Sequence, residues 1–396
     1  MSKLFESARI KTMYLKNRIV KSALFESMAT LDGLPTDKTL HFYERLARGG
    51  TGLIITGYAY VNKDGRSYPL QNGAHSDAII ERWRRVTEKV HEHGSRIALQ
   101  IVHGGRQTKP VASDNRRRLA PSAIPNLVYF TWPKSMSEEE IWQTITDFAD
   151  AAERAVKAGF DAIQIHAAHG YLISSFLSPV TNRRTDRWGG SIRGRFRFLE
   201  EVYKAVRLRV GNDFPVLAKL NIIDFVPLGL SPNNSFPAAM LLAELGLDAL
   251  EISGGIAETS LGMSRGDSPA KVITRNRSPL LRLYFTLSLA GMKAVLPFRE
   301  NYFLDYARRL KPALTIPLIL VGGIRNPLAA EQILQAGHAD FISMARPLVR
   351  EPSLPNKWLK GSTRPATCTS CNRCLGEVEQ GNILKCYLLK KTADPA

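Results

Sequence analysis

The stretch Asp161-Ala-Ile-Gln-Ile-His166-Ala-Ala-His169-Gly-Tyr171-Leu combines an apolar run with a polar end. The run at 162–166 has the length and composition of a buried β-strand. It follows an amphipathic segment at 138–158, and Gly159 lies where a helix should stop. Ser137 and Glu140 form a capping-box pattern at the other end of that segment. The stretch is therefore predicted to close one helix-to-strand unit of an α/β protein.

The same alternation recurs along the chain. Buried strands are predicted at 18–24, 52–56, 96–102, 162–166, 216–221, 249–253, 318–321 and 341–344. Helices are predicted at 37–48, 77–93, 138–158, 195–210, 236–245, 302–310 and 327–335. These strands are apolar nearly throughout, which is typical of parallel strands covered on both faces. The pattern predicts a closed (β/α)₈ TIM barrel over residues 1–362, with a short cysteine-containing C-terminal extension at 363–396.

A doubly wound open sheet is the competing fold, and it needs a glycine fingerprint after its first strand. The first β-run leads instead into Phe25-Glu26-Ser27-Met28, which favours the barrel. Two long connections, at 104–137 and 254–300, follow the third and sixth strands. Both are expected at the C-terminal mouth of the barrel, where active sites are built.

Composition narrows the class of protein. The chain has 396 residues, of which 44% are hydrophobic and 23% charged, which is typical of a soluble globular protein. It has no apolar run long enough for a membrane span and no secretory signal, so a cytoplasmic location is expected. The net charge of +18 would suit phosphates, acidic substrates or nucleic acid. We interpret it as a solvated basic surface, and nucleic-acid binding is not expected.

Three polar side chains follow the predicted fourth strand: His166, His169 and Tyr171. Two imidazole N–H groups could share one developing oxyanion, and a nearby phenol could supply a proton. Structural histidines or a metal-binding pair are the alternatives that spacing leaves open.

Other polar or glycine positions also fall at strand ends. Gly322 and Gly323 follow the seventh strand, and Ala345 and Arg346 follow the eighth, where barrels often bind phosphate. Gln100 and Lys219, near the ends of the third and fifth strands, could point into the mouth. A plain turn and an ordinary strand-end lysine are the simpler interpretations.

All four cysteines lie in the tail, at Cys368, Cys371, Cys374 and Cys386. A disulfide framework would spread its cysteines across the domain, whereas this cluster indicates a metal. The spacing is closer to an iron–sulfur run than to a zinc ribbon, although zinc and unligated thiols stay open.

Taken together, these residues resemble the Old Yellow Enzyme family of flavin oxidoreductases over nearly the whole chain up to about Pro352. The resemblance is carried by Leu15-Lys-Asn-Arg18-Ile-Val, Phe42-Tyr-Glu-Arg-Leu-Ala-Arg-Gly-Gly50, Gly52-Leu-Ile-Ile-Thr-Gly57, Leu99-Gln100-Ile-Val-His-Gly-Gly105, His166-Ala-Ala-His169-Gly-Tyr171-Leu, Ser178-Pro-Val-Thr-Asn-Arg183 and Asp186-Arg-Trp-Gly-Gly-Ser191. It implies a barrel that holds FMN in its mouth and uses NAD(P)H as co-substrate.

The resemblance also implies roles for individual residues. Ser22 and Ala23 would line the flavin, Gln100 would bond its pyrimidine edge, and Lys219 would lie near N1 and O2. The flavin phosphate would be held by Gly322, Gly323, Ala345 and Arg346. His166 and His169 would grip a carbonyl or nitro oxygen of the substrate. Tyr171 would protonate the α-carbon of an activated alkene while a hydride reaches the β-carbon.

Three positions depart from the pattern that relatives often show. Phe25 stands where a Thr or Cys is frequent beside the flavin, and Tyr58 stands where a small residue is usual. Both are expected to line the substrate pocket. Lys219 takes the place of a frequent Arg, so it would offer a point charge instead of a planar fork.

The tail resembles that of the 2,4-dienoyl-CoA reductase and trimethylamine dehydrogenase branch, in which such cysteines bind a [4Fe–4S] cluster. Those proteins continue into nucleotide-binding domains, and this sequence does not. A cluster here would therefore be structural, be absent, or take electrons from an external partner protein.

The leading hypothesis is thus an NAD(P)H-dependent, FMN-containing ene reductase acting on a small molecule. One alternative is a tRNA-dihydrouridine synthase, which is disfavoured because that chemistry needs a barrel cysteine. The other is a basic protein that binds zinc and nucleic acid without catalysis. A homo-oligomer is compatible with the sequence, which does not give the oligomeric state.

Overall fold

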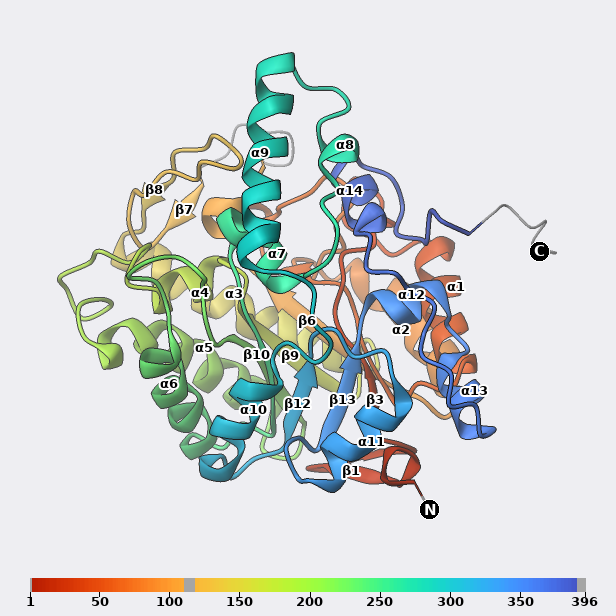
Figure 1. Ribbon diagram of the computed structural model, residues 1–396. Coiled ribbons are helices and arrows are strands. Elements are labelled where there is room, and N and C mark those ends of the chain that lie inside the picture. The colour runs from red at the N-terminus through yellow and green to blue at the C-terminus, as the bar shows by residue number, and fades with distance from the viewer. Residues whose placement is uncertain (1, 110–117, 390–396) are drawn as a thin grey trace.

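The computed structural model describes residues 2–109 and 118–389. Eight parallel strands pair in a closed ring, because β4 hydrogen-bonds both β3 and β6 at the two ends of the series. The strands of the ring are β3 (Ile19–Lys21), β4 (Leu53–Ile55), β6 (Arg96–Val102), β9 (Ala162–Ala167), β10 (Val216–Asn221), β11 (Ala249–Ser253), β12 (Leu318–Val321) and β13 (Phe341–Met344). Figure 1 shows them at the centre of the molecule with helices around them. The predicted (β/α)₈ barrel is confirmed.

Helices follow the strands as the alternation predicts. The surrounding helices are α1 (Asp37–Arg48), α2 (Ile79–His91), α3 (Glu138–Lys157), α4 (Leu172–Leu177), α5 (Ile192–Val210), α6 (Pro232–Glu244), α10 (Leu304–Leu310), α11 (Pro327–Gln335), α12 (Arg346–Arg350) and α13 (Leu354–Leu359). The capping box at the start of α3 is present: Glu140 N–H donates to Ser137 Oγ at 3.2 Å, and Ser137 N–H donates to Glu140 Oε2 at 2.8 Å. Two unpaired helix-end donors are satisfied in this way.

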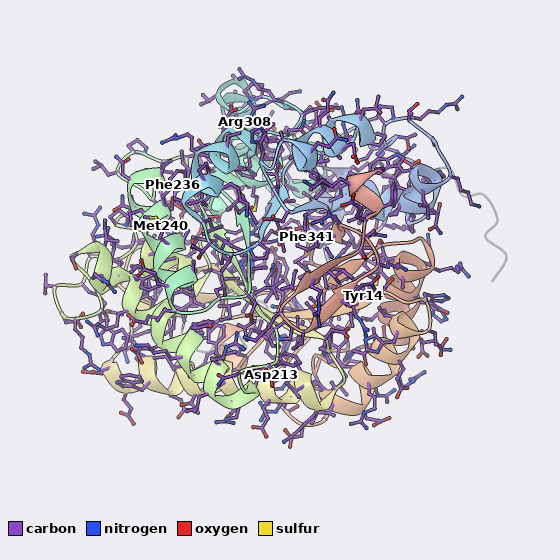
Figure 2. The ribbon with its side chains drawn as sticks, turned by 90° about the horizontal axis from the view of Figure 1, so that it is seen from below. Tyr14, Asp213, Phe236, Met240, Arg308 and Phe341 are labelled. Carbon is purple, nitrogen blue, oxygen red and sulfur yellow. The ribbon has the colours of Figure 1, made fainter. Side chains whose placement is uncertain are left out.

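A hairpin of β1 (Ala8–Ile10) and β2 (Met13–Leu15) covers the N-terminal end of the barrel. Ile10, Met13 and Leu15 pack in one buried cluster with Phe341 and other strand residues. Figure 2, seen from below, shows this end of the molecule, with Tyr14 and Phe341 labelled. The hairpin leaves the C-terminal mouth as the open end of the barrel.

The two long connections lie at the mouth, as expected. The first carries β7 (Leu119–Ala120) and β8 (Lys134–Ser135), which pair with each other. Outside this connection, the short strand β5 (Ala59–Tyr60) pairs with β6. The second carries α7 (Ser260–Met263), α8 (Ala270–Ile273) and α9 (Pro279–Val295), and Figure 1 shows α9 rising above the barrel. Helix α14 (Arg373–Glu379) of the tail contacts α8.

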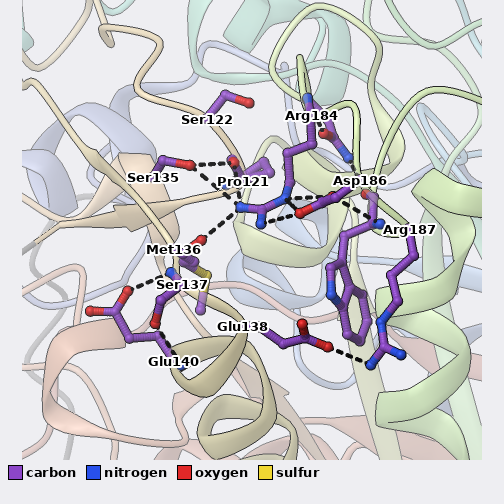
Figure 3. A network of polar contacts seen from close by, with 12 residues as sticks. Pro121, Ser122, Ser135, Met136, Ser137, Glu138, Glu140, Arg184, Asp186 and Arg187 are labelled. Atoms are coloured by element: carbon purple, nitrogen blue, oxygen red, sulfur yellow. Dashed lines mark hydrogen bonds and ion pairs between the residues drawn. The ribbon is translucent and has the colours of Figure 1, made fainter.

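The segment 184–191, which includes one of the motifs quoted from the sequence, holds the first long connection against the barrel. The Arg184 guanidinium donates to the carbonyls of Pro121 at 3.1 Å and Met136 at 2.7 Å, and it pairs with Asp186. Arg187 pairs with Glu138 at 2.6 Å, at the start of α3 (Figure 3). These basic residues have structural partners, which supports the interpretation that much of the local positive charge is not a binding surface.

Among the residues that the structure describes, no helix combines the length and the hydrophobicity needed to cross a membrane.

Candidate active site

A cavity of about 800 Å³ opens at the C-terminal ends of the strands. Its lining includes every barrel residue predicted for the site: Ser22, Ala23, Phe25, Tyr58, Gln100, His166, His169, Tyr171, Lys219, Gly322, Gly323, Ala345 and Arg346. These residues are scattered over most of the chain, and the barrel brings them together because parallel strands end on the same side. Lining residues from 257–292 and 370–380 form the outer wall.

The two histidines lie edge to face, with ring centroids 5.1 Å apart. His166, in β9, accepts the Ala168 N–H at Nδ1 over 3.3 Å, so its own proton sits on Nε2. His169 has a positive φ of 64° and a backbone N–H bonded to Asn221 Oδ1 at 3.0 Å. Its Nε2 lies 2.7 Å from Ser253 Oγ. Both rings are therefore fixed by their neighbours before any ligand binds.

Both imidazoles are neutral at ordinary pH. Burial lowers the pKa of His169 to about 3, and the positive charge of Lys219 adds to the effect. Burial, His169 and Lys219 together hold the pKa of His166 well below its usual value. Each ring then carries one N–H, which can donate to an oxygen without bringing a full positive charge.

Tyr171 stands at the N-terminal end of α4, 4.9 Å from His166 between ring centroids. Burial raises the pKa of its phenol, the hydrogen bond with Tyr58 opposes that rise, and the charge of Glu379 adds to it. The phenol is consequently protonated across the physiological range, as a proton donor must be.

Beneath these groups lies a buried polar network that the sequence analysis missed. Glu251, in β11, is fully buried and lies 3.2 Å from Lys219 Nζ. Its oxygens also accept hydrogen bonds from Ser22 Oγ at 2.7 Å, Gln164 Nε2 at 2.9 Å and Ser343 Oγ at 3.0 Å. A single carboxylate inside an otherwise apolar strand was the signal that could have revealed it.

Gln100 joins this network through Gln164, whose Oε1 accepts its amide N–H at 2.6 Å. The Oε1 atom of Gln100 is buried and has no hydrogen-bond partner among the residues that the structure describes. A buried acceptor without a donor is costly, so this atom calls for a ligand N–H or a water molecule. An FMN ring edge, which carries an N–H between two carbonyls, fits this requirement.

Gly322 and Gly323 lie after β12 with φ of 118° and 75°, which favours glycine. Side chains there would collide with Tyr302 and Phe303. Arg346, after the adjacent β13, lines the cavity but is also bonded to the Arg265 carbonyl at 3.0 Å and to Asn372 Oδ1. Arg346 thus links the second long connection (254–300) to the tail, and it also lines the cavity at the predicted phosphate position.

The four cysteines line a second, small cavity together with Arg346 and Arg350. All are free thiols, and Arg350 donates to Cys386 Sγ at 3.1 Å. Burial raises the pKa of Cys374 to about 11; Arg346 opposes the rise, and Cys368 and Cys371 add to it. Within 2–109 and 118–389, no three histidine, cysteine or acidic side chains are placed to hold a metal ion. Metal binding by the tail therefore stays a prediction.

Two neutral imidazoles and a phenol thus face a cavity in which Gln100 Oε1 calls for an N–H donor, as expected of a flavin-dependent oxidoreductase. The chain belongs to the NADH:flavin oxidoreductase / NADH oxidase family, which matches residues 3–284. The resemblance to Old Yellow Enzyme is confirmed.

Known relatives agree with this assignment. The chain is 36% identical to a 4,4'-dithiodibutanoate disulfide reductase of Rhodococcus erythropolis, over 96% of this chain and 93% of the relative. It is 33% identical to an NADH oxidase of Thermoanaerobacter brockii, over 99% of this chain but only 56% of that longer protein. The structure of an Old Yellow Enzyme homologue from Zymomonas mobilis superimposes with a TM-score of 0.73 at 26% identity, over 93% and 96% of the two chains.

The chain is therefore an FMN-dependent NAD(P)H oxidoreductase, of the type that reduces activated alkenes. Family membership decides against both alternatives considered from the sequence, the tRNA-dihydrouridine synthase and the non-catalytic zinc protein.

Proposed function

We propose that this protein reduces an electron-poor small molecule, foremost an α,β-unsaturated carbonyl compound, with His166 and His169 binding its oxygen and Tyr171 supplying the proton. The observation that carries the proposal is the convergence of two neutral imidazoles and one protonated phenol on a single cavity, with ring centroids 5.1 Å and 4.9 Å from His166. Neutral donors suit an oxygen that gains negative charge only during the reaction.

The residues around the cavity fit FMN. Gln100 would bond the pyrimidine edge, Lys219 would lie near N1 and O2, and Ser22 and Ala23 would line the ring. The glycine turn and the residues after β13 would hold the phosphate, namely Gly322, Gly323, Ala345 and Arg346. When bound, FMN supplies the chemistry of hydride transfer from NAD(P)H to the substrate.

The protein's own groups would direct the rest of the reaction. The Nε2–H of His166 donates to the substrate oxygen, and Ser253 and Asn221 fix His169 beside it. The Tyr171 O–H then protonates the α-carbon. The apolar wall formed by Phe25 and Leu261 would limit the access of water to the reacting atoms.

Location and domain organisation are also part of the proposal. We infer a cytoplasmic location, a folding unit at 1–362 that carries the tail at 363–396, and assembly as a homo-oligomer. The cysteines would hold a [4Fe–4S] cluster or, failing that, zinc, and a cluster would receive electrons from an external protein.

The test separates the two half-reactions under anaerobic conditions. The purified protein should show flavin absorption, bleach on addition of NADH or NADPH, and recover its colour with cyclohexenone. The disulfide 4,4'-dithiodibutanoate serves as the competing oxidant, because a relative of similar length is named for it. Failure to bind FMN, or reoxidation by the disulfide alone, would contradict the proposal.

A further inference from the structure

The C-terminal tail reaches into the catalytic cavity. Leu375, Gly376, Val378 and Glu379 of α14 line it together with His166 and Tyr171. Val378 also packs in a buried cluster with Phe25 and Tyr68. The tail is thus a wall of the active site as well as the carrier of the four cysteines.

Glu379 is the charged group that this wall presents. Its Oε2 accepts a hydrogen bond from Lys109 Nζ at 2.6 Å, and its Oε1 accepts one from the Tyr68 hydroxyl. The Lys109 ammonium also lies 4.1 Å from the centre of the Tyr68 ring. Both carboxylate oxygens are therefore occupied, and the ion pair ties the tail to the connection after β6.

Aromatic contacts continue from this ion pair to the proton donor. The Tyr68 ring lies 4.5 Å from that of Phe25, Phe25 lies 5.7 Å from Tyr58, and Tyr58 lies 5.1 Å from Tyr171. Side chains packed in this way transmit a displacement, because a close-packed cluster has little free space.

The last contact joins Tyr58 to the phenol that would donate the proton. The two rings are tilted by 50° with their centroids 5.1 Å apart, and both residues line the cavity. Burial raises the pKa of both phenols, so both are protonated before the reaction. The position of the Tyr171 ring therefore depends on where the Tyr58 ring lies.

We propose that Glu379 is a positioning residue for proton transfer: held by Lys109 and Tyr68, it fixes the aromatic cluster of Tyr68, Phe25 and Tyr58 against which Tyr171 packs. This inference rests on the proposed function. In the step concerned, the Tyr171 O–H bond breaks as a C–H bond forms at the substrate α-carbon. The electron pair stays on the Tyr171 oxygen until solvent returns a proton.

The test compares Glu379→Ala with Glu377→Ala. Glu377 lies on the same helix and is bonded to Arg275 and Asn382, so its loss reports on tail docking alone. Glu379→Ala should slow alkene reduction by about tenfold and enlarge its solvent deuterium isotope effect, since displacement of reacting groups is costly. The rate of flavin reduction by NAD(P)H and the affinity for FMN should not change. Lys109→Met should reproduce this pattern, and it replaces Glu379→Ala if that variant does not fold.

A second arm asks whether the effect passes through Tyr58. In a Tyr58→Ala background, which lacks the ring that contacts Tyr171, Glu379→Ala should cause less than about a twofold further loss, because coupled residues are not additive. An unchanged isotope effect in Glu379→Ala, equal losses in the two glutamate variants, or a full further loss in the Tyr58→Ala background would each overturn the proposal. A wild-type protein that binds no FMN or reduces no alkene would instead refute the proposed function.

Discussion

Lys219 and Glu251 form a buried ion pair beneath the catalytic cavity, with Lys219 Nζ 3.2 Å from Glu251 Oε2. The two side chains come from the adjacent strands β10 and β11 and are directly paired in register. Because three further donors surround Glu251, the carboxylate is held in place independently of any cofactor. The Glu251 carboxylate therefore largely neutralises the Lys219 charge that would face the flavin.

Glu251→Gln should leave this lysine charge unbalanced. We expect the midpoint potential of the bound flavin to rise by about 30 mV or more, because a positive charge favours the reduced, more negative flavin. Unfolding free energy should fall by about 3 kcal/mol, as expected when one partner of a buried pair is removed. Spectroelectrochemistry and denaturant unfolding measure the two effects. Glu81→Gln removes an exposed carboxylate that pairs with Arg84, so it serves as the control and should change neither quantity.

Tyr171→Phe should separate the two half-reactions. Loss of a positioned proton donor lowers a rate by about 100-fold or more, so alkene reduction should slow by that factor. Flavin reduction by NAD(P)H should stay within about twofold of the wild-type rate, because no proton from Tyr171 is used there. Stopped-flow measurement of each half-reaction checks this, and equal losses in both would refute the role of Tyr171.

The double variant His166→Ala, His169→Ala should chiefly lose ligand affinity. Phenols bind such sites through their oxygen, so the Kd of a phenol, read from flavin absorbance, should rise by about 100-fold for two lost hydrogen bonds. Retained FMN binding shows that the barrel is intact. An unchanged Kd would mean that the pair does not hold the oxygen.

Acid should destabilise the protein through its buried histidines. Burial lowers the pKa of His103 and His169 to about 3, against about 6.5 in an unfolded chain. The unfolded chain then binds more protons between these values. The unfolding free energy is therefore unaffected by these histidines above about pH 6.5. It falls as the pH drops from about 6.5 to about 3, by up to about 1.4 kcal/mol per pH unit for each histidine.

His103→Gln isolates one of these contributions. His103 Nδ1 accepts the Gly105 N–H, and within residues 2–109 and 118–389 its Nε2 has no hydrogen-bond partner. The residue has no role in the proposed catalysis. The slope of unfolding free energy against pH should become shallower in this variant. A slope identical to that of the wild type would contradict the assignment.

The four cysteines of the tail predict the iron and sulfide content of the purified protein. If the four thiols hold a cube, anaerobically purified protein should contain about four iron and four sulfide per chain. Cys386→Ser should abolish that content and leave FMN bound. Zinc, or empty thiols, would exclude the cluster.

The ring of strands could be predicted from sequence because its physical signal is local. Runs such as 96–102 and 216–221 are mostly apolar, and the structure shows strands with these bounds. Two helices begin earlier than predicted. Ser191 caps α5 through Gly194 N–H, and Pro232 occupies the first turn of α6, where proline is favoured.

The second long connection, at 254–300, was harder to predict from the sequence. Helix α9 is apolar on most of its faces and exposes Leu280 and Leu287, so it lacks the one-sided pattern on which helix prediction depends. The site was predicted where polar residues end a strand, as at His166. Glu251 and Glu379 were missed because their importance comes from partners, Lys219 and Lys109, that are far away in the sequence.

Closure of the ring joins opposite ends of the chain. Ile342 in β13 is the neighbour of Ile19 in β3, so the first strand borders the last. During synthesis one edge of β3 stays unpaired until β13, more than 300 residues later in the sequence, has left the ribosome. Contacts of such large sequence separation slow folding, and an unpaired strand edge invites association with other chains. Prompt binding of that edge by a chaperone would accordingly be an advantage in the cell.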